Sequence, residues 1–408
     1  MDGGDEAQFP GIPPFPNTVP TAPLVRISLA NLLARDAEEE DKLWNACCDL
    51  GFFYLDLRRS RGVGTGGAAS GATNGACKVG SNGAAAEGAI IDGERLLADA
   101  DALFDVAEEF FALPVEEKAK YDFSDQRSYF GYKGFGVGIL DDKGSRDRNE
   151  FYNVSKDDIL GISSPLPAPH LFNKHRALLR SYIEQSHGLI ELILRFLEPR
   201  LQLPAQSLES LHRVDAVSGD QVRFIKAPPQ PPDDRRTALG AHTDFGSVTV
   251  LFNRVGGLQV RLPASIAAVE PAVPGRMSEA ERSLCTEGWA YVHPLPGHAI
   301  INLGDALVKF SAGILRSNIH RVVAPPGAQG DVTRYSLVYF SRPEDEVVLK
   351  ALKDSPLIAE RVGRGWEEQE EAVTSKEWIL RRALGRREGK YYDPSKAKGT
   401  EEARGARG

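Results

Sequence analysis

The sequence is poor in the features that mark secreted, metal-stapled and membrane proteins. Its 408 residues include only four cysteines, at positions 47, 48, 77 and 285, and no CxxC pair that would favour a zinc site or a disulfide framework. No apolar run reaches the ~18 residues that span a membrane, and the acidic N-terminus lacks the apolar core of a signal peptide. We therefore expect reduced thiols, no membrane contact and a cytoplasmic location.

Positive charge is also scarce, which bears on the partners of the protein. Lysine and arginine total 49 against 57 aspartates and glutamates, so the net charge is −8. A protein that binds nucleic acid through a basic surface carries the opposite balance. The remaining composition, with 42% hydrophobic and 26% charged residues, is typical of a globular protein. The sequence favours a small-molecule substrate over a nucleic acid, and slightly favours a monomer.

Large apolar residues are nearly absent from a segment at about residues 58–90, which consists mainly of Gly, Ala, Ser, Thr and Asn. It contains a G-x-G-x-x-G pattern at Gly62, Gly64 and Gly67, but no helix is indicated after the third glycine, as a dinucleotide-binding fingerprint requires. Because so few of its side chains can pack, we expect a disordered insertion. A short linker should replace residues 61–88 with little loss of activity.

The apolar residues divide the rest of the chain into regions. Residues 1–23, rich in Pro and Gly, are expected to form an extended arm. Residues 24–220 are expected to pack on the core as a region of helices and strands, with an aromatic, Gly-rich stretch at 122–144 that is typical of a loop at a pocket edge. Residues 344–408 are expected to form a helical tail whose end is disordered. Helical spacing predicts helices over 36–50, 94–112 and 171–201, the last being the longest, and alternation predicts strands over 24–29 and 51–57.

Residues 221–343 differ from the rest because short β-branched and aromatic runs alternate there with Gly, Pro and Asn. Many short strands separated by turn signals indicate a β-sandwich or jelly roll. The fold class predicted is α+β with a mainly β core, flanked by helices that include one long helix. The predicted strands of this core cover residues 221–226, 247–252, 258–262, 289–293, 299–303, 319–323 and 335–340.

Histidine and aspartate occur at metal-ligand spacing in this β region. His242 and Asp244 stand at the start of a predicted strand, and residues i and i+2 of a strand point to one face. A second histidine would complete a 2-His-1-carboxylate iron site. His320, on the predicted strand 319–323, is the best candidate. His293 and His298 are alternatives, but both lie in turn-like sequence close to proline.

An arginine and a hydroxyl open the last predicted strand of this region. Arg334 and Ser336 are two residues apart, so the strand period again places them on one face. A guanidinium fork and a hydroxyl supply the donors that a buried carboxylate needs. The order HxD, His and RxS within one β region is much rarer by chance than any one of these patterns.

In these motifs the chain resembles the iron(II)/2-oxoglutarate-dependent dioxygenases of the isopenicillin N synthase-like group. The resemblance implies a double-stranded β-helix as the catalytic core over 221–343. It implies that His242, Asp244 and His320 bind Fe(II), that Arg334 and Ser336 bind 2-oxoglutarate, and that O2 is the other cosubstrate. The matching stretches are HTDFGSVTVL at 242–251, GGLQV at 256–260, INLGD at 301–305, NIHRV at 318–322 and RYS at 334–336, with GFFY at 51–54 and FFALPVEEK at 110–118 before the core.

The chain departs from this group in the strand before the proline pair at 228–229. Many relatives carry Asn and Tyr there to help hold the cosubstrate, where this sequence has Ile225 and Ala227. Arg223 would share their face of the strand and either compensate or form a structural ion pair.

The resemblance implies hydrogen abstraction from a small organic substrate, such as a secondary metabolite, with hydroxylation, desaturation or ring closure as the result. No catalytic residue beyond the iron ligands is predicted. Two alternatives stay open: an oxidase like isopenicillin N synthase that uses no 2-oxo acid, and a non-catalytic barrel used for binding. The residues expected to line the substrate pocket are Phe245, Phe340, Tyr132, Phe135 and Arg223.

Overall fold

The computed structural model describes residues 8–63, 90–140, 144–273, 277–366 and 372–387. Most of the Gly-rich insertion, residues 64–89, and the end of the C-terminal tail, residues 388–408, lie outside the described residues. The expectations of disorder for these two segments therefore remain expectations.

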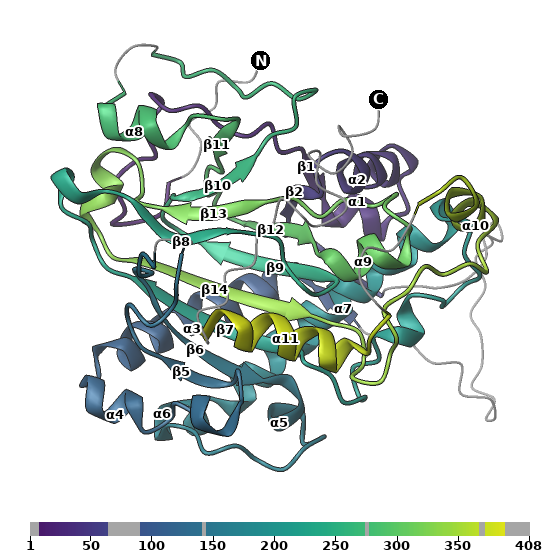
Figure 1. Cartoon of the computed structure of the whole chain (residues 1–408), viewed down its shortest axis with the longest axis horizontal. Coiled ribbons are helices and arrows are strands. Elements are labelled where there is room, and N and C mark those ends of the chain that lie inside the picture. The colour runs from purple at the N-terminus through teal and green to yellow at the C-terminus, as the bar shows by residue number, and fades with distance from the viewer. Residues whose placement is uncertain (1–7, 64–89, 141–143, 274–276, 367–371, 388–408) are drawn as a thin grey trace.

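An eight-stranded sheet runs through the middle of the molecule, in the order β1-β2-β12-β9-β14-β7-β6-β5 (Figure 1). All neighbours in it are antiparallel except β1 and β2, which are parallel. Its strands are β1 (Arg26–Ser28), β2 (Phe52–Asp56), β5 (Gly131–Lys133), β6 (Glu150–Ser155), β7 (Gln221–Ala227), β9 (Val248–Asn253), β12 (His298–Leu303) and β14 (Arg334–Ser341).

A four-stranded sheet, β11-β10-β13-β8, faces this large sheet. Strands β7 to β14 thus supply four strands to each of two sheets, which is the double-stranded β-helix predicted from the sequence. The fold class is confirmed. The strands of the smaller sheet are β8 (Thr237–His242), β10 (Leu258–Arg261), β11 (Trp289–Tyr291) and β13 (His320–Val323).

The region before the core does more than pack on it, because it lengthens the large sheet at both edges. Strands β1 and β2 add to β12 at one edge, and β6 and β5 add to β7 at the other. The sequence analysis did not predict β6. Its two faces have different surroundings: Phe151 and Asn153 line the central cavity, whereas Tyr152 and Val154 are buried in the core against the helices. Polar and apolar residues therefore fail to separate cleanly between the two faces.

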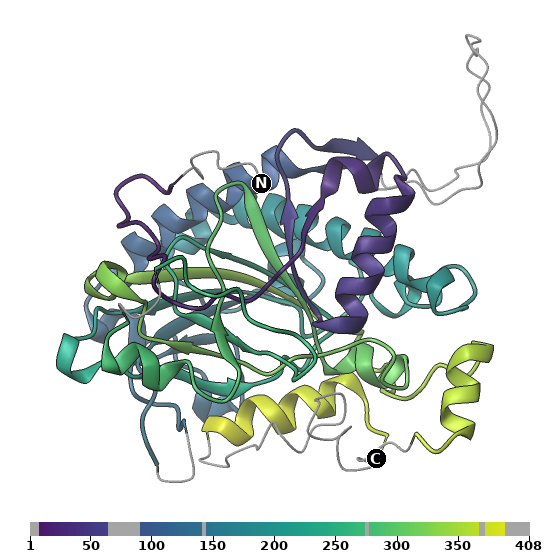
Figure 2. The ribbon, with the colours of Figure 1, turned by 90° about the horizontal axis from the view of Figure 1, so that it is seen from above.

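Two long helices, α3 (Gly93–Ala112) and α7 (Arg176–Arg200), cover the outer face of the large sheet (Figure 2). The apolar stripe that predicted α3 is buried there, with Leu103 and Phe110 fully inaccessible. Burial of each such side chain stabilises the fold by roughly 1.5–3 kcal/mol. The predicted long helix 171–201 is divided at His175, which separates α6 (His170–Lys174) from α7 because its backbone leaves the helical region.

The remaining helices are short or lie at the edges of the barrel. Helix α2 follows the predicted range, and α10 and α11 lie where a helical tail was expected. These helices are α1 (Leu29–Leu33), α2 (Ala37–Asp49), α4 (Val115–Ala119), α5 (Lys156–Leu160), α8 (Glu279–Leu284), α9 (Asp305–Phe310), α10 (Pro356–Gly363) and α11 (Ser375–Arg387).

Residues 61–63 and 90–92 form strands, so the disorder predicted for about 58–90 is not found at these margins. Strands β3 (Arg61–Val63) and β4 (Ile90–Asp92) form an antiparallel pair in which Val63 lies opposite Ile90. The backbone hydrogen bonds of this short pair hold Val63 and Ile90 opposite each other.

Both ends of the described chain pack on the barrel. In the N-terminal arm, the ring of Phe15 stacks on His293 with centroids 4.5 Å apart, and Pro13 accepts a hydrogen bond from Gln329 Nε2. Near the C-terminus, the Trp378 indole of α11 donates to the backbone carbonyl of Phe245, 3.1 Å away. Helix α11 is thereby fixed beside the loop that leads from β8 to β9.

A buried ion pair links α7 to the start of β7. His187 Nδ1 lies 3.5 Å from Asp220 Oδ2, and the same oxygen accepts a hydrogen bond from Tyr339. Burial favours the neutral imidazole, but the carboxylates of Asp220 and Glu191, each 3.5 Å from a ring nitrogen, outweigh burial and raise the pKa of His187 to about 9. Burial likewise opposes the Asp220 carboxylate, yet His187 lowers the pKa of Asp220 to about 2. The pair is therefore charged at neutral pH.

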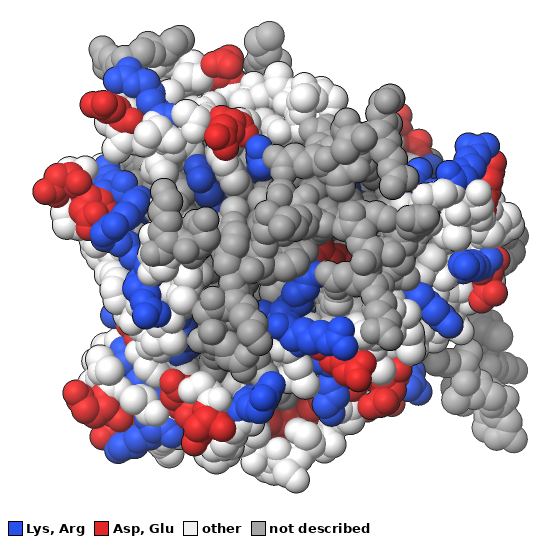
Figure 3. Space-filling model, in the orientation of Figure 1, with Lys and Arg blue, Asp and Glu red and all other residues white. Residues whose placement is uncertain are grey.

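The surface carries both signs of charge. Around the rim of the face shown in Figure 3, Lys and Arg side chains lie among Asp and Glu side chains. Within the part of the chain that the structure describes, no helix combines the length and apolar character needed to cross a membrane.

Candidate active site

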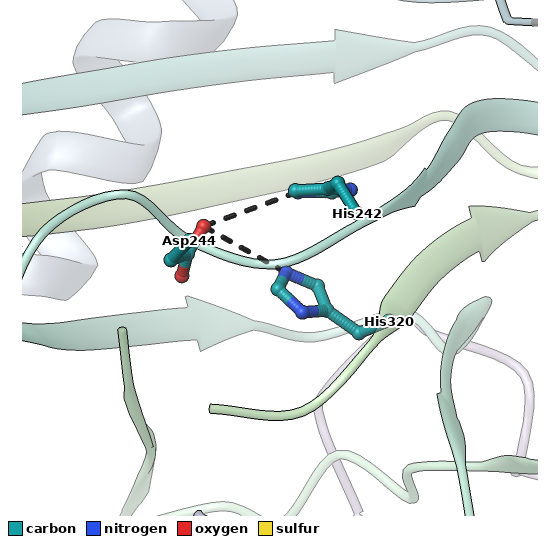
Figure 4. Close-up of side chains that lie close together, drawn as sticks. All are labelled: His242, Asp244 and His320. Carbon is teal, nitrogen blue, oxygen red and sulfur yellow. Dashed lines mark ion pairs between the residues drawn. The ribbon is translucent and has the colours of Figure 1, made fainter. Parts of the chain in front are cut away.

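The two histidines and the aspartate singled out in the sequence meet between the two sheets (Figure 4). His242 is the last residue of β8, and His320 is the first residue of β13 and its direct neighbour in register. Asp244 Oδ1 lies 3.9 Å from His242 Nε2 and 3.8 Å from His320 Nε2. One ligand atom from each residue falls within 4.8 Å of the other two, a spacing at which all three can bind one metal ion.

The local geometry of Asp244 differs from the one used to predict it. Asp244 lies after the end of β8, in the turn that leads to β9, so the alternation of a strand does not apply to it. The turn is tight because Gly246 lies against Ser341, where a Cβ atom would come within 2.3 Å of a carbonyl oxygen. Asp244 is thus directed toward the histidines by the turn, and the prediction named the right residue for the wrong reason.

Backbone carbonyls fix which nitrogen of each imidazole faces the centre. His242 Nδ1 lies 2.8 Å from the carbonyl oxygen of Gly240, and His320 Nδ1 lies 3.1 Å from that of Asn318. A carbonyl only accepts hydrogen bonds, so each neutral ring carries its proton on Nδ1. Nε2, the nitrogen that faces Asp244, is then the unprotonated metal-binding atom.

Two side chains orient the carboxylate. Thr249 Oγ1 and Asn302 Nδ2 each donate to Asp244 Oδ2 at 2.7 Å, which leaves Oδ1 as the oxygen nearest both histidines. Burial opposes the charge of Asp244, but the neighbouring His320 and His242 and these two hydrogen bonds lower its pKa. The carboxylate is therefore ionised at neutral pH, and the donor set suits a divalent iron. Neither Thr249 nor Asn302 was predicted, although they lie in the quoted stretches 242–251 and 301–305.

The alternative histidines lie elsewhere. His293 stacks on Phe15, and His298 begins β12, where its Nε2 lies 3.7 Å from Asp56 Oδ2. Neither belongs to the group of ligand atoms around Asp244.

Arg334 and Ser336 lie on the same face of β14, as predicted, and line the same cavity as the metal ligands. The Arg334 side chain is only 3% exposed. Its Nε donates to the Gly256 carbonyl at 2.7 Å, and its Nη1 donates to Ser336 Oγ. No carboxylate among the described residues forms an ion pair with it, and burial lowers its pKa to about 10. At neutral pH this is a buried cation whose counter-charge must come from a bound anion.

The positions where relatives carry Asn and Tyr lie directly beside this arginine. Ile225 pairs with Ser336, and Ala227 pairs with Arg334. Neither can donate a hydrogen bond from its side chain, so Arg334 and Ser336 are the polar groups that β7 and β14 present there. Arg223 shares the cavity face with Ile225, as predicted.

The cavity has a volume of about 190 Å³. Of the residues predicted for a substrate pocket, Phe245, Phe340 and Arg223 line it. Tyr132 does not: its neighbour Lys133 faces the cavity, while Tyr132 donates to Glu150 at 2.6 Å and packs in the core. Phe135 is 54% exposed and also does not line the cavity.

Comparisons with known proteins agree with this site. The family model of the 2OG-Fe(II) oxygenase superfamily matches residues 218–343, and the model of the N-terminal region of non-haem dioxygenases in morphine synthesis matches residues 96–173. A 2-oxoglutarate-dependent dioxygenase of Aspergillus fumigatus is 31% identical over 352 residues, which cover 85% of this chain and 82% of the relative. The dioxygenase gloE of Glarea lozoyensis is 28% identical over 347 residues, covering 85% of this chain and 86% of the relative.

Solved structures share the fold. A full-length Neurospora crassa protein, solved in complex with alpha-KG and thymine, aligns with a TM-score of 0.62 at 19% identity, covering 89% of this chain and 96% of the Neurospora chain. JOX2, solved with 2OG, Fe and JA, aligns with a TM-score of 0.59 at 21% identity, covering 98% of this chain and 92% of JOX2.

The chain therefore belongs to the 2OG-Fe(II) oxygenase superfamily. It is a 2-oxoglutarate-dependent dioxygenase, an oxidoreductase that takes Fe(II) through His242, Asp244 and His320 and uses 2-oxoglutarate as cosubstrate.

Proposed function

We propose that the enzyme oxidises a C–H bond of a small organic molecule held in the central cavity. Hydroxylation, desaturation and ring closure all begin with the same hydrogen abstraction, so each falls within the proposal. The observation that carries it is a metal-binding triad and an uncompensated buried arginine in one cavity of about 190 Å³. Fe(II), when bound, supplies the activation of O2 that is coupled to conversion of 2-oxoglutarate to succinate and CO2.

Arg334 and Ser336 bind the distal carboxylate of 2-oxoglutarate in this proposal. A guanidinium offers a planar fork of donors, and the Ser336 hydroxyl lies against it. The buried guanidinium of Arg334 attracts an anion strongly, because charges interact more strongly where the surrounding strands exclude water. With Ile225 and Ala227 as neighbours, most of the binding energy for this carboxylate comes from the arginine.

The side chains around the metal hold its ligands in place. Thr249 and Asn302 orient Asp244, while Gly240 and Asn318 hold the histidine rings through their carbonyls. Partners of this kind keep the ligand geometry fixed as substrate enters. The apolar walls exclude water from the reacting groups.

Two solved structures of the same fold were obtained with small molecules, the Neurospora crassa protein with thymine and JOX2 with JA. This supports a small-molecule substrate here. We also infer that the enzyme acts as a cytoplasmic monomer. This inference rests on the sequence, which has few cysteines and no CxxC pair.

The proposal is tested by measuring succinate released by the purified, Fe(II)-loaded enzyme across a panel of small organic molecules. The expected result is that certain compounds stimulate succinate release in a fixed ratio to oxidised product, and that Arg334→Gln abolishes this stimulation at moderate 2-oxoglutarate concentration. Product formation without succinate would refute the coupling and favour an oxidase that draws all its electrons from the substrate.

A further inference from the structure

Strand β14 carries a second inward-facing arginine beyond the one assigned to 2-oxoglutarate. Every second residue from 334 to 342 lines the cavity, and the arginines stand at the two ends of this row. The row consists of Arg334, Ser336, Val338, Phe340 and, one residue past the end of the strand, Arg342.

The metal site lies between the two arginines. Thr249, which donates to Asp244, pairs in register with Phe340, whereas Asn253 pairs with Ser336. The metal ligands are therefore at the level of Phe340 along β14. Arg342 lies on the far side of them from Arg334, where a substrate rather than the cosubstrate would extend.

Arg342 is a buried cation that forms no ion pair with a carboxylate among the described residues. Arg342 is only 6% exposed, and its Nη1 is buried without any hydrogen-bond partner among the described residues. The guanidinium lies against two rings, with its Cζ 5.5 Å from the centroid of Tyr129 and 5.7 Å from that of Phe340. Ring contacts offset only part of the cost of burying a charge.

The acidic groups closest to Arg342 have other partners. Asp220 accepts the backbone N–H of Arg342 at 2.7 Å, but its charge is paired with that of His187. Asp345 forms an ion pair with Lys376 at 3.3 Å. Neither carboxylate forms an ion pair with the Arg342 guanidinium, and Asp345 attracts its charge only at longer range.

A second guanidinium approaches the same ring. The Cζ of Arg223 lies 5.0 Å from the centroid of Phe340 and 4.3 Å from that of Phe151, and its Nε donates to Asn153 Oδ1 at 2.8 Å. Two like charges around one buried ring repel each other unless an anion lies near both.

The charge of the cavity as a whole points the same way. Its described lining has four cationic residues, Lys133, Arg223, Arg334 and Arg342, and two carboxylates, Asp147 and Asp244. Asp147 is paired with Lys133, and Asp244 binds the metal. Among the described lining residues, no carboxylate is therefore left to form an ion pair with Arg342.

We propose that the substrate is an apolar organic acid whose carboxylate is bound by Arg342, with Arg223 beside it. The fork of Arg342 would orient the molecule, and its apolar body would lie along Phe340 toward the metal site. This inference rests on the proposed function, since it assigns the substrate class of the same cavity. It predicts that a carboxylate, and not an uncharged polar group, is the feature by which the enzyme selects its substrates.

The test uses the full-length chain loaded with Ni(II), which replaces Fe(II) without supporting turnover, and saturated with 2-oxoglutarate. Binding of phenylacetate, cinnamate and octanoate is measured by titration calorimetry, each beside its primary amide. At least one acid should bind roughly tenfold or more tightly than its amide, as expected for charge-assisted hydrogen bonds. In Arg342→Gln this preference should disappear, and Arg342→Lys should retain part of it because it keeps the charge without the fork.

Matched variants separate this inference from its alternatives. Arg364→Gln removes an arginine that is 78% exposed at the end of α10 and should leave every affinity unchanged. Thermal unfolding and circular dichroism confirm that each variant is folded. Arg342→Gln should leave the 2-oxoglutarate affinity unaltered, because Arg342 is not assigned to the cosubstrate. If the wild-type protein fails to bind 2-oxoglutarate, the proposed function is wrong and the inference about Arg342 falls with it. If no acid binds more tightly than its amide, or if the preference survives in Arg342→Gln, the inference is wrong.

Discussion

Substitution of Arg334 by glutamine should separate the affinity for 2-oxoglutarate from the stability of the protein. Arg334 is 3% exposed and forms no ion pair within the described residues. Leaving a buried carboxylate without its cationic partner costs roughly 3–5 kcal/mol, which is at least two orders of magnitude in affinity. The dissociation constant for 2-oxoglutarate should rise by that factor, while metal binding survives because Arg334 contacts no metal ligand.

In the absence of 2-oxoglutarate, the same substitution should cost the fold little stability. Burial lowers the pKa of Arg334 from its ordinary value to about 10, so folding disfavours the charged form throughout the neutral range. Each pKa unit corresponds to about 1.4 kcal/mol, so the unliganded fold carries an unfavourable term on the order of 3 kcal/mol. Arg334→Gln removes this term together with two hydrogen bonds. We expect the unliganded variant to be about as stable as the wild type, and to gain much less stability from 2-oxoglutarate.

Thermal unfolding with Ni(II), with and without 2-oxoglutarate, measures both effects, and calorimetry gives the dissociation constants. Arg321→Gln is a matched control, since Arg321 is also a strand arginine whose pKa burial lowers, but it bonds Gln259 and Leu284 away from the cavity. That variant should lose stability and keep its 2-oxoglutarate affinity. Ser336→Ala should weaken binding by about 1.5–3 kcal/mol, and Arg334→Lys should fall between glutamine and wild type. An unchanged dissociation constant in Arg334→Gln would refute the assignment.

Three further predictions follow from the same structure. His242→Ala should abolish metal binding and turnover with an unchanged circular dichroism spectrum. Asn302→Ala should weaken metal binding roughly 10–100-fold, as substitutions of groups that orient metal ligands typically do. Metal titration checks both variants, and wild-type metal affinity in either would refute the site described. His187→Gln should destabilise the fold by roughly 3–5 kcal/mol at about pH 6. Folding raises the pKa of His187 from 6.5 to about 9, so the stabilisation by its charge is fully present below pH 6.5 and is lost as pH rises through 9. The free energies of unfolding of the variant and the wild type, measured in urea, should therefore converge above pH 9. A difference that stays constant with pH would contradict the ion pair. A short Gly/Ser linker in place of residues 64–89 should leave activity unchanged, since Val63 and Ile90 already lie opposite each other, and a folded but inactive variant would show a role for the insertion.

Much of the framework could be predicted because apolar side chains repeat with the period of the element that buries them. The stripe of α3 and the alternation in β9 and β14 each mark a face that packs against another layer. Strand β8 was missed because its sequence, TALGAH, has few large side chains. Gly240 is required there, since a Cβ atom would come within 2.8 Å of the Leu140 carbonyl oxygen. A strand that another backbone segment approaches this closely carries small residues, so the alternation of large apolar and polar side chains is weak.

The site shows the same division between local and long-range information. The type of each metal ligand could be predicted from spacing, but the turn that directs Asp244 and the donors Thr249 and Asn302 depend on contacts between strands far apart in the chain. Tyr132 and Lys133 are adjacent residues of β5, and only the pairing of that strand decides which of them faces the cavity. Aromatic character alone therefore selected the wrong neighbour.

Strand β14 shows how far one local rule reaches when it is followed to its end. Alternation placed Arg334 and Ser336 on one face, and the same step of two leads through Phe340 to Arg342. The sequence analysis named no residue of this row beyond Phe340, where the predicted strand ended. Here the chain after β14 stays buried, with the backbone N–H of Arg342 bound to Asp220, so the side chain is held in the cavity. A single strand therefore places one cation on each side of the metal site, and the distance along it from the metal separates the group that holds the cosubstrate from the group that we propose selects the substrate.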